Sequence, residues 1–205
     1  MLDLAHPAAA LGLGLALGVT PGPVQVLLLT ESARGVGRGL RAMLGANGTF
    51  GILLFLLALG LPLLSPTGVA LRVLQVAGGL FLAYLAVDTF RAAGQEPKAS
   101  GPGRSLPPAS RGVVAVILNP GAWIFLATTA TALMADATRD GGRYLAVLTS
   151  ATLLAGVMVA DGAVVAVGAG GRRGLRGRSW NWVVRILALA LAALGIWLVA
   201  RGLLP

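Results

Sequence analysis

The chain has 205 residues, of which 57% are hydrophobic and only 11% are charged. Soluble domains carry roughly 25% charged residues, so a soluble protein of this length could not cover its surface with so few charges. This composition excludes a soluble enzyme, a disordered protein and a nucleic-acid-binding domain, although the net charge is +9. The chain has no cysteine and one histidine, His6. Disulfides and thiolate metal sites are therefore excluded, and a histidine metal cluster or a Ser/His triad is not expected.

Six apolar stretches predict an all-α integral membrane protein with six transmembrane helices, because a membrane span needs about 20 apolar residues. In chain order they cover residues 8–32, 40–64, 69–90, 109–135, 144–169 and 182–199. The first stretch is not expected to be a signal peptide. It is longer than a signal-peptide core, and the residues before it include Asp3 and no Lys or Arg.

A polar stretch rich in Gly and Pro divides the six spans into two groups of three. It covers residues 93–110 and is typical of a flexible linker. We therefore predict a single membrane domain over residues 1–205, with a first three-span repeat at 1–92, a cytoplasmic linker at 93–110 and a second three-span repeat at 111–205.

The basic residues predict the orientation of the spans. By the positive-inside rule, the loops that are rich in Lys and Arg face the cytoplasm. Most of the 16 basic residues follow the first span, surround the linker or follow the fifth span, which places both termini outside. These loops are short and have no interleaved aromatic residues, so they do not indicate nucleic-acid binding. The cytoplasmic group comprises Arg34, Arg38, Arg41, Arg91, Lys98, Arg104, Arg111, Arg172, Arg173, Arg176, Arg178 and Arg185.

A Pro-Gly motif occurs twice, each time well inside the first span of its half. The two copies lie at residues 18–24 (GVTPGPV) and 117–123 (ILNPGAW). Three spans separate them, so the second copy crosses the membrane in the opposite direction. This arrangement predicts two inverted three-helix repeats, as in secondary transporters that bind their substrate near the middle of the membrane.

Each motif is predicted to break the first helix of its repeat. Proline has no N–H and its ring clashes with an earlier carbonyl, so Pro21, Pro23 and Pro120 free backbone carbonyls inside the span. The residues before the motifs, Thr20 and Asn119, are good helix N-caps. A second half-helix would then start in mid-membrane, where its N-terminus suits a carboxylate and the freed carbonyls suit a cation. The alternative is a packing kink without a binding role.

Two polar side chains extend this predicted site. Gln25 lies one turn past Pro21, and Asn47 lies among Gly45, Gly48 and Gly51 in the second span. Amide side chains among small residues either face a cavity or join two helices. The predicted substrate-binding residues are Thr20, Pro21, Gly22, Pro23, Gln25, Asn47, Asn119, Pro120 and Gly121.

Ionisable residues inside spans are costly and point to function. Asp161 lies deep in the fifth span, far from other charges in the sequence, and is predicted to couple transport to protons or to hold a substrate ammonium. Asp88 lies one turn before Arg91 and is a second candidate for proton coupling, although an i, i+3 ion pair with Arg91 or snorkelling at the membrane edge explains it without a function. Glu31 beside Arg34 is similar.

At these residues the chain resembles the lysine exporter family of bacterial amino-acid efflux proteins (LysE/RhtB type). The resemblance covers nearly the whole chain. Val24 departs from it, because the family commonly has Asn there, and Ala86 stands where the family usually has Gly. The resemblance implies export of a small solute, usually an amino acid, driven by the proton or ion gradient. The segments that carry it are TPGP at 20–23, GVGRG at 35–39, GANG at 45–48, GGLFLAY at 78–84 and NP at 119–120.

Together these features predict a secondary transporter that exports small amino acids or related zwitterionic metabolites by alternating access. We expect it in the bacterial inner membrane, with no cofactor and no metal. Its expected partners are the amino acid, the lipid bilayer and, from the small residues in its helices, a second copy in a homodimer. The alternatives are an exporter of metal cations or of another small or lipid-linked solute, a membrane-embedded enzyme, and a non-transporting scaffold. The lack of Cys and the single deep carboxylate disfavour the metal exporter and the enzyme.

Overall fold

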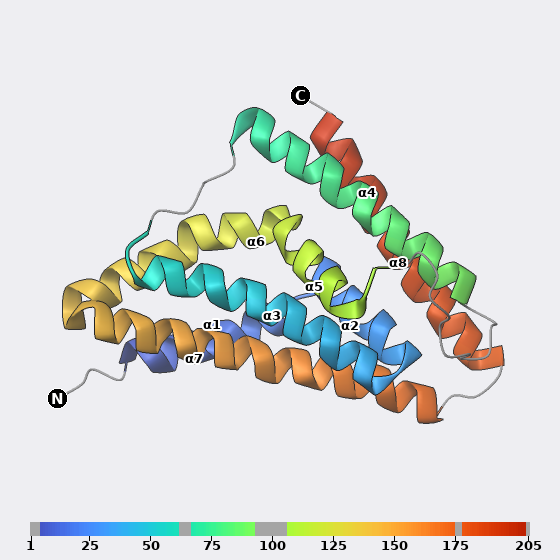
Figure 1. Ribbon diagram of the computed structural model, residues 1–205, viewed down its shortest axis with the longest axis horizontal. Helices are drawn as coiled ribbons and strands as arrows, with labels where there is room; N and C mark the ends of the chain where they lie inside the picture. The colour runs from blue at the N-terminus through green and yellow to red at the C-terminus, as the bar shows by residue number, and fades with distance from the viewer. Residues whose placement is uncertain (1–4, 62–66, 93–105, 175–177, 204–205) are drawn as a thin grey trace.

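The computed structural model describes residues 5–61, 67–92, 106–174 and 178–203, which are almost entirely helical. Most of the predicted linker, residues 93–105, lies outside the described residues, as does Arg176. Figure 1 shows the arrangement of the helices. In chain order they are α1 (Ala5–Val19), α2 (Pro23–Arg34), α3 (Val36–Ala58), α4 (Gly68–Ala92), α5 (Pro108–Ile117), α6 (Pro120–Phe125), the π-helical turn η1 (Leu126–Ala130), α7 (Thr131–Gly174) and α8 (Arg178–Leu203).

Four described helical segments are long and apolar enough to cross a membrane. They are Val36–Ala58, Gly68–Arg91, Pro120–Gly171 and Asn181–Leu203. The pair α1 and α2, bent by 65°, makes a fifth if it is one broken span. At this level the predicted all-α membrane architecture is confirmed.

The segment Pro120–Gly171 has 52 residues and is too long to be one straight span. At about 1.5 Å per residue it would far exceed an apolar layer of about 30 Å. The helix breaks at Gly141 and Gly142, and Gly142 has φ 67°, a left-handed conformation that glycine adopts readily. In Figure 1 the chain runs along α6 into α7, turns at the left edge and returns beside α1 and α3. The loop that the sequence predicts between residues 135 and 144 is therefore a tight glycine turn.

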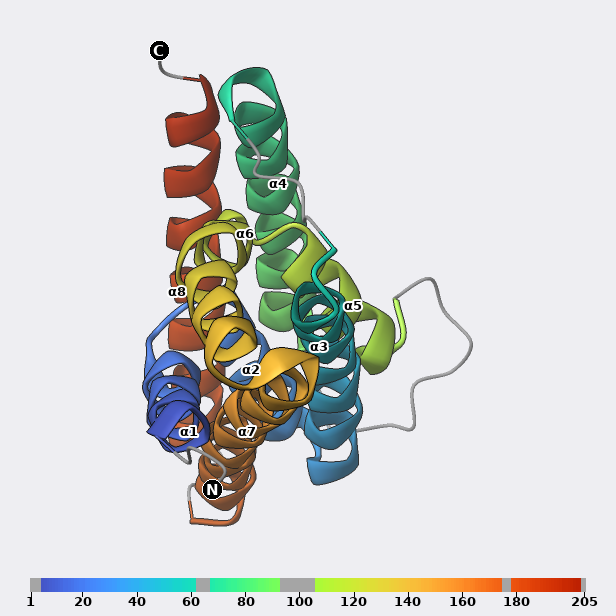
Figure 2. The same ribbon diagram turned by 90° about the vertical axis from the view of Figure 1, so that its left-hand side faces the viewer.

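Glycines allow two long helix pairs to approach closely. Where α1 crosses α7, a Cβ atom on Gly14 would meet the backbone of α7, and one on Gly156 would meet the backbone of α1. Where α4 packs along α8, Cβ atoms on Gly79 and Gly195 would each meet the carbonyl of the other residue. Figures 1 and 2 both show α4 and α8 side by side. Small residues permit this approach in membranes, where helices associate through close packing.

The pair of α3 and α5 is built in the same way. A Cβ atom on Gly45 would collide with the carbonyl of Ala109, and one on Gly112 would collide with the carbonyl of Ala42. These contacts hold the short helix α5 against α3 and so fix the second Pro-Gly motif next to the first half of the chain.

Substitution of Gly45 tests this packing. Gly45→Ala places a methyl group against the α5 backbone and is expected to destabilise the protein by about 1–3 kcal/mol, the usual cost of overpacking. Gly48→Ala, one turn further along α3, is the matched control, because a Cβ atom at Gly48 meets nothing within 4 Å. The measurement is the midpoint of thermal unfolding in detergent. Equal midpoints for the two variants would contradict the close contact.

The outer surface of the bundle is strongly apolar. Large hydrophobic side chains are exposed along α3 and α8, among them Ile52, Phe55, Leu189 and Ile196. Soluble monomers do not expose apolar surface on this scale. These faces are therefore suited to contact with lipid tails.

Candidate functional site

The first break lies at residues 20–22, between α1 and α2. Gly22 is the N-cap of α2 in an extended conformation (φ −166°, ψ −178°), and Pro23 begins the helix. The prediction that Thr20 caps the second half-helix is wrong, because its Oγ1 donates a hydrogen bond to the carbonyl of Ala16, at 2.7 Å. The reason is the second proline, which is favoured at the first helical position and so moves the cap to the residue just before it.

Two of the carbonyls freed at this break find partners nearby. The backbone N–H of Thr20 donates to the carbonyl of Leu17 at 3.2 Å. The side chain of Gln25 reaches back across the break, and its Nε2 donates to the carbonyl of Gly18 at 3.2 Å. Gln25 therefore joins the two half-helices.

The second break lies between α5 and α6. Asn119 is the N-cap of α6, as predicted, and its Oδ1 accepts a hydrogen bond from the N–H of Gly121 at 3.0 Å. Trp123 then reaches back across the break, and its Nε1 donates to the carbonyl of Ile117 at 2.7 Å. The sequence analysis did not assign this role to Trp123. Its position three residues after Pro120, within one turn of the proline that breaks the helix, is the signal that could have indicated it.

A cavity of about 300 Å³ lies between the two breaks. Most of the predicted substrate-binding residues line it, together with Asp161; Pro120 is buried but is not part of the lining. The cavity thus brings together residues from both halves of the chain. Its lining consists of Leu17, Gly18, Thr20, Pro21, Gly22, Pro23, Val24, Gln25, Ala46, Asn47, Phe50, Val116, Asn119, Gly121, Ala122, Val157 and Asp161.

Two buried polar side chains of the cavity lie beside each other, and each has an atom without a hydrogen bond of normal geometry. Asp161 on α7 is 1% exposed and Asn47 on α3 is 4% exposed. The Oδ1 atom of Asp161 and the Nδ2 atom of Asn47 complete no such hydrogen bond among the described residues. Asp161 is also the one ionisable residue in the lining. Buried polar groups are normally paired, so this pair of atoms suits a ligand or ordered water.

Among the residues that the structure describes, there is no group of three or more His, Cys, Asp or Glu side chains that could hold a metal ion.

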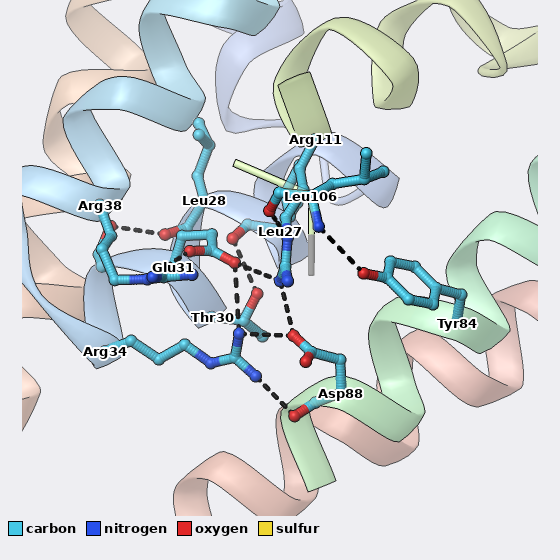
Figure 3. A network of polar contacts seen from close by, with 11 residues as sticks. Leu27, Leu28, Thr30, Glu31, Arg34, Arg38, Tyr84, Asp88, Leu106 and Arg111 are labelled. Atoms are coloured by element: carbon cyan, nitrogen blue, oxygen red, sulfur yellow. Dashed lines mark hydrogen bonds and ion pairs between the residues drawn. The ribbon is translucent and has the colours of Figure 1, made fainter. Parts of the chain in front are cut away.

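Asp88 lies outside the cavity lining, in a network of ion pairs that Figure 3 shows. Its Oδ2 atom accepts hydrogen bonds from Arg34 and from Arg111, both at 2.7 Å. Arg111 also donates to Glu31 at 2.7 Å, and Arg38 donates to Glu31 at 2.9 Å. The network joins α2, α3, α4 and α5. The role of Asp88 in proton coupling stays a prediction.

Arg111 is the centre of this network. Its side chain is 1% exposed, its Nε donates to the carbonyl of Leu106, and its guanidinium lies 5.9 Å from the ring centre of Tyr84. From the sequence it was read only as one of the basic residues that set orientation. Its acidic partners, Glu31 and Asp88, lie in the other half of the chain, which the local sequence does not indicate.

Comparison with known proteins agrees with this architecture. Residues 15–202 match the family model of the LysE type translocator. Searches of curated proteins and of solved structures give no significant match. The family match covers both breaks, the cavity and the ion-pair network. Its members are membrane transporters rather than enzymes, which implies export of a small solute across a lipid bilayer. This chain is therefore a multi-pass membrane protein that belongs to the LysE type translocator family.

Proposed function

We propose that the protein is a secondary transporter that exports small amino acids or related zwitterionic metabolites. The observation that carries the proposal is the cavity, which joins both Pro-Gly breaks to a buried carboxylate. A zwitterion carries an ammonium and a carboxylate. Asp161 suits the ammonium, and a helix N-terminus suits the carboxylate. The unpartnered atoms of Asp161 and Asn47 support a polar ligand in this place.

We further propose six spans arranged as two inverted repeats, counting the arms of α7 on either side of Gly142 as separate spans. The packing supports this, because α1 meets the second arm of α7 through glycines as α5 meets α3. The breaks support it too. In each half a side chain of the following helix, Gln25 or Trp123, bonds to a freed carbonyl of the preceding helix.

Transport would then proceed by alternating access between the two halves, with Asp161 coupling substrate movement to protons. The protein would lie in the bacterial inner membrane with both termini outside, as the basic residues predict. A homodimer remains a prediction from the small residues on the helices.

An export assay tests the proposal directly. Cells that carry the protein, or an empty vector, are loaded with a panel of dipeptides, and the amino acids that appear in the medium are quantified. We expect faster release of particular amino acids only from cells with the protein. If no amino acid leaves faster than from empty-vector cells, despite confirmed expression in the membrane, the proposal is wrong. A metal cation, a lipid-linked solute or a scaffold role would then replace it.

A further inference from the structure

The two broken helices differ in how their second halves are capped. The N-terminus of α6 is closed by its own residue, since Asn119 accepts a hydrogen bond from Gly121. The N-terminus of α2 has Gly22 as its cap and no side-chain hydrogen bond. The next N–H groups, those of Val24 and Gln25, have no acceptor within the helix, as is general in a first helical turn. Both residues line the cavity, so α2 presents an open, partly positive end to it.

A second, independent observation concerns two buried polar side chains in another part of the same cavity. The side chains of Asp161 and Asn47 are buried beside each other. The Oδ1 atom of Asp161 and the Nδ2 atom of Asn47 nevertheless complete no hydrogen bond of normal geometry among the described residues. An ionised carboxylate oxygen only accepts hydrogen bonds, so it suits a ligand that supplies a cation or a hydrogen-bond donor. The cavity therefore offers groups for both charges of one small molecule.

Apart from Thr20, Gln25 and Asn119, the rest of the lining has no polar side chain. Leu17, Phe50, Val116 and Val157 contribute aliphatic or aromatic surface, and Asp161 is the one ionisable residue among the lining residues. A substrate with a further charged group would bring that charge into apolar surroundings without a partner, which is strongly unfavourable.

On the basis of the proposed function, we propose that the substrate is an α-amino acid with an uncharged, apolar side chain, bound in one orientation. Its carboxylate binds the open N-terminus of α2, and its ammonium binds Asp161. Its side chain packs against Phe50 and the aliphatic residues. The N-terminus of α6, capped by Asn119, does not hold the carboxylate.

Competition with a labelled substrate tests both the charge pattern and the side-chain class. The purified full chain is placed in liposomes, and exchange of labelled leucine is measured against unlabelled competitors. We expect valine to compete. Lysine and glutamate carry an extra charge, leucine methyl ester lacks the carboxylate, and 2-hydroxy-4-methylpentanoate lacks the ammonium. Each of these four should compete at least about tenfold more weakly, because a site built for polar partners rejects analogues that do not match it.

A substitution at Gly22 tests the role of the α2 terminus. Gly22→Asn would let α2 cap itself as α6 does. A Cβ atom here meets the end of the Gln25 side chain at 3.3 Å and the carbonyl oxygen of Thr20 at 3.9 Å, an ordinary contact. We expect the KM for leucine to rise about tenfold or more, because the added cap competes for the donors, while thermal stability stays equal or increases. Gly22→Ala is the matched control. It adds bulk without an acceptor, and its KM should rise much less.

The outcomes distinguish a failure of this inference from a failure of the proposed amino-acid transport. If the methyl ester competes as well as leucine, or if both Gly22 variants raise KM equally, the assigned orientation is wrong. If lysine or glutamate competes as well as valine, the side-chain class is wrong. In both cases amino-acid transport itself would still hold. If the protein exchanges no amino acid, the inference and the proposed function both fail.

Discussion

Asp161→Asn is expected to lower amino-acid export by about tenfold to a hundredfold, the equivalent of losing one charge-assisted hydrogen bond of about 1.5–3 kcal/mol. Asn has nearly the same shape as Asp, so the cavity should keep its form. The amide carries no negative charge for an ammonium and takes up no proton. The measurement is release of amino acids from dipeptide-loaded cells, normalised to the amount of protein in the membrane.

Asp136→Asn is the matched control for this result. Asp136 lies on the first arm of α7, pairs on the surface with Arg139, at 2.9 Å, and has a side chain that is 51% exposed. It should export at the rate of the unmodified protein, because exposed ion pairs contribute little. Equal export by the two variants would show that transport does not depend on Asp161.

Arg111→Met is expected to destabilise the protein by about 3–5 kcal/mol, the usual cost of removing one partner of a buried ion pair. Glu31 is 1% exposed and would lose its shortest ion-pair contact, and Asp88 would keep only Arg34. Met fills a similar volume, so the loss of stability comes from the missing charge rather than from a cavity in the packing. The measurement is the thermal midpoint and the yield of monodisperse protein after detergent extraction.

Two further variants make this result specific. Arg139→Met removes an exposed arginine and should shift the midpoint little. In Arg111→Met, Glu31 keeps its contacts with Arg38 and Arg34, so adding Glu31→Gln removes these ion pairs as well and should lower the stability further. A midpoint for Arg111→Met within error of the unmodified protein would contradict the structural role of the network.

The parts of the structure that were predictable depend on local chemistry. Long apolar stretches give spans in any fold, and a proline inside a span frees a carbonyl whatever surrounds it. The breaks at Pro21 and Pro120 were therefore predictable. The exact cap was not, because Thr20 and Gly22 both precede a proline and only the structure decides between them.

The ion-pair network depends on distant residues, which explains why it was missed. Glu31 and Arg111 are 80 residues apart in sequence yet 2.7 Å apart in the structure. In the sequence, an arginine near the end of a span indicates orientation and nothing more. The gathering of Asn47, Asp161 and both breaks around one cavity also depends on tertiary packing, although each residue was a candidate alone.

The network has a consequence for how the protein is made. Glu31 and Asp88 are synthesised before Arg111, and Arg34 can already pair with both of them. An isolated second half has neither acid, so it would bring Arg111 into the membrane without its ion-pair partners. We therefore expect the first half to stay near the insertion site during translation until α5 emerges. The order of the two halves along the chain suits this, because the acidic partners are in place before the arginine that they neutralise.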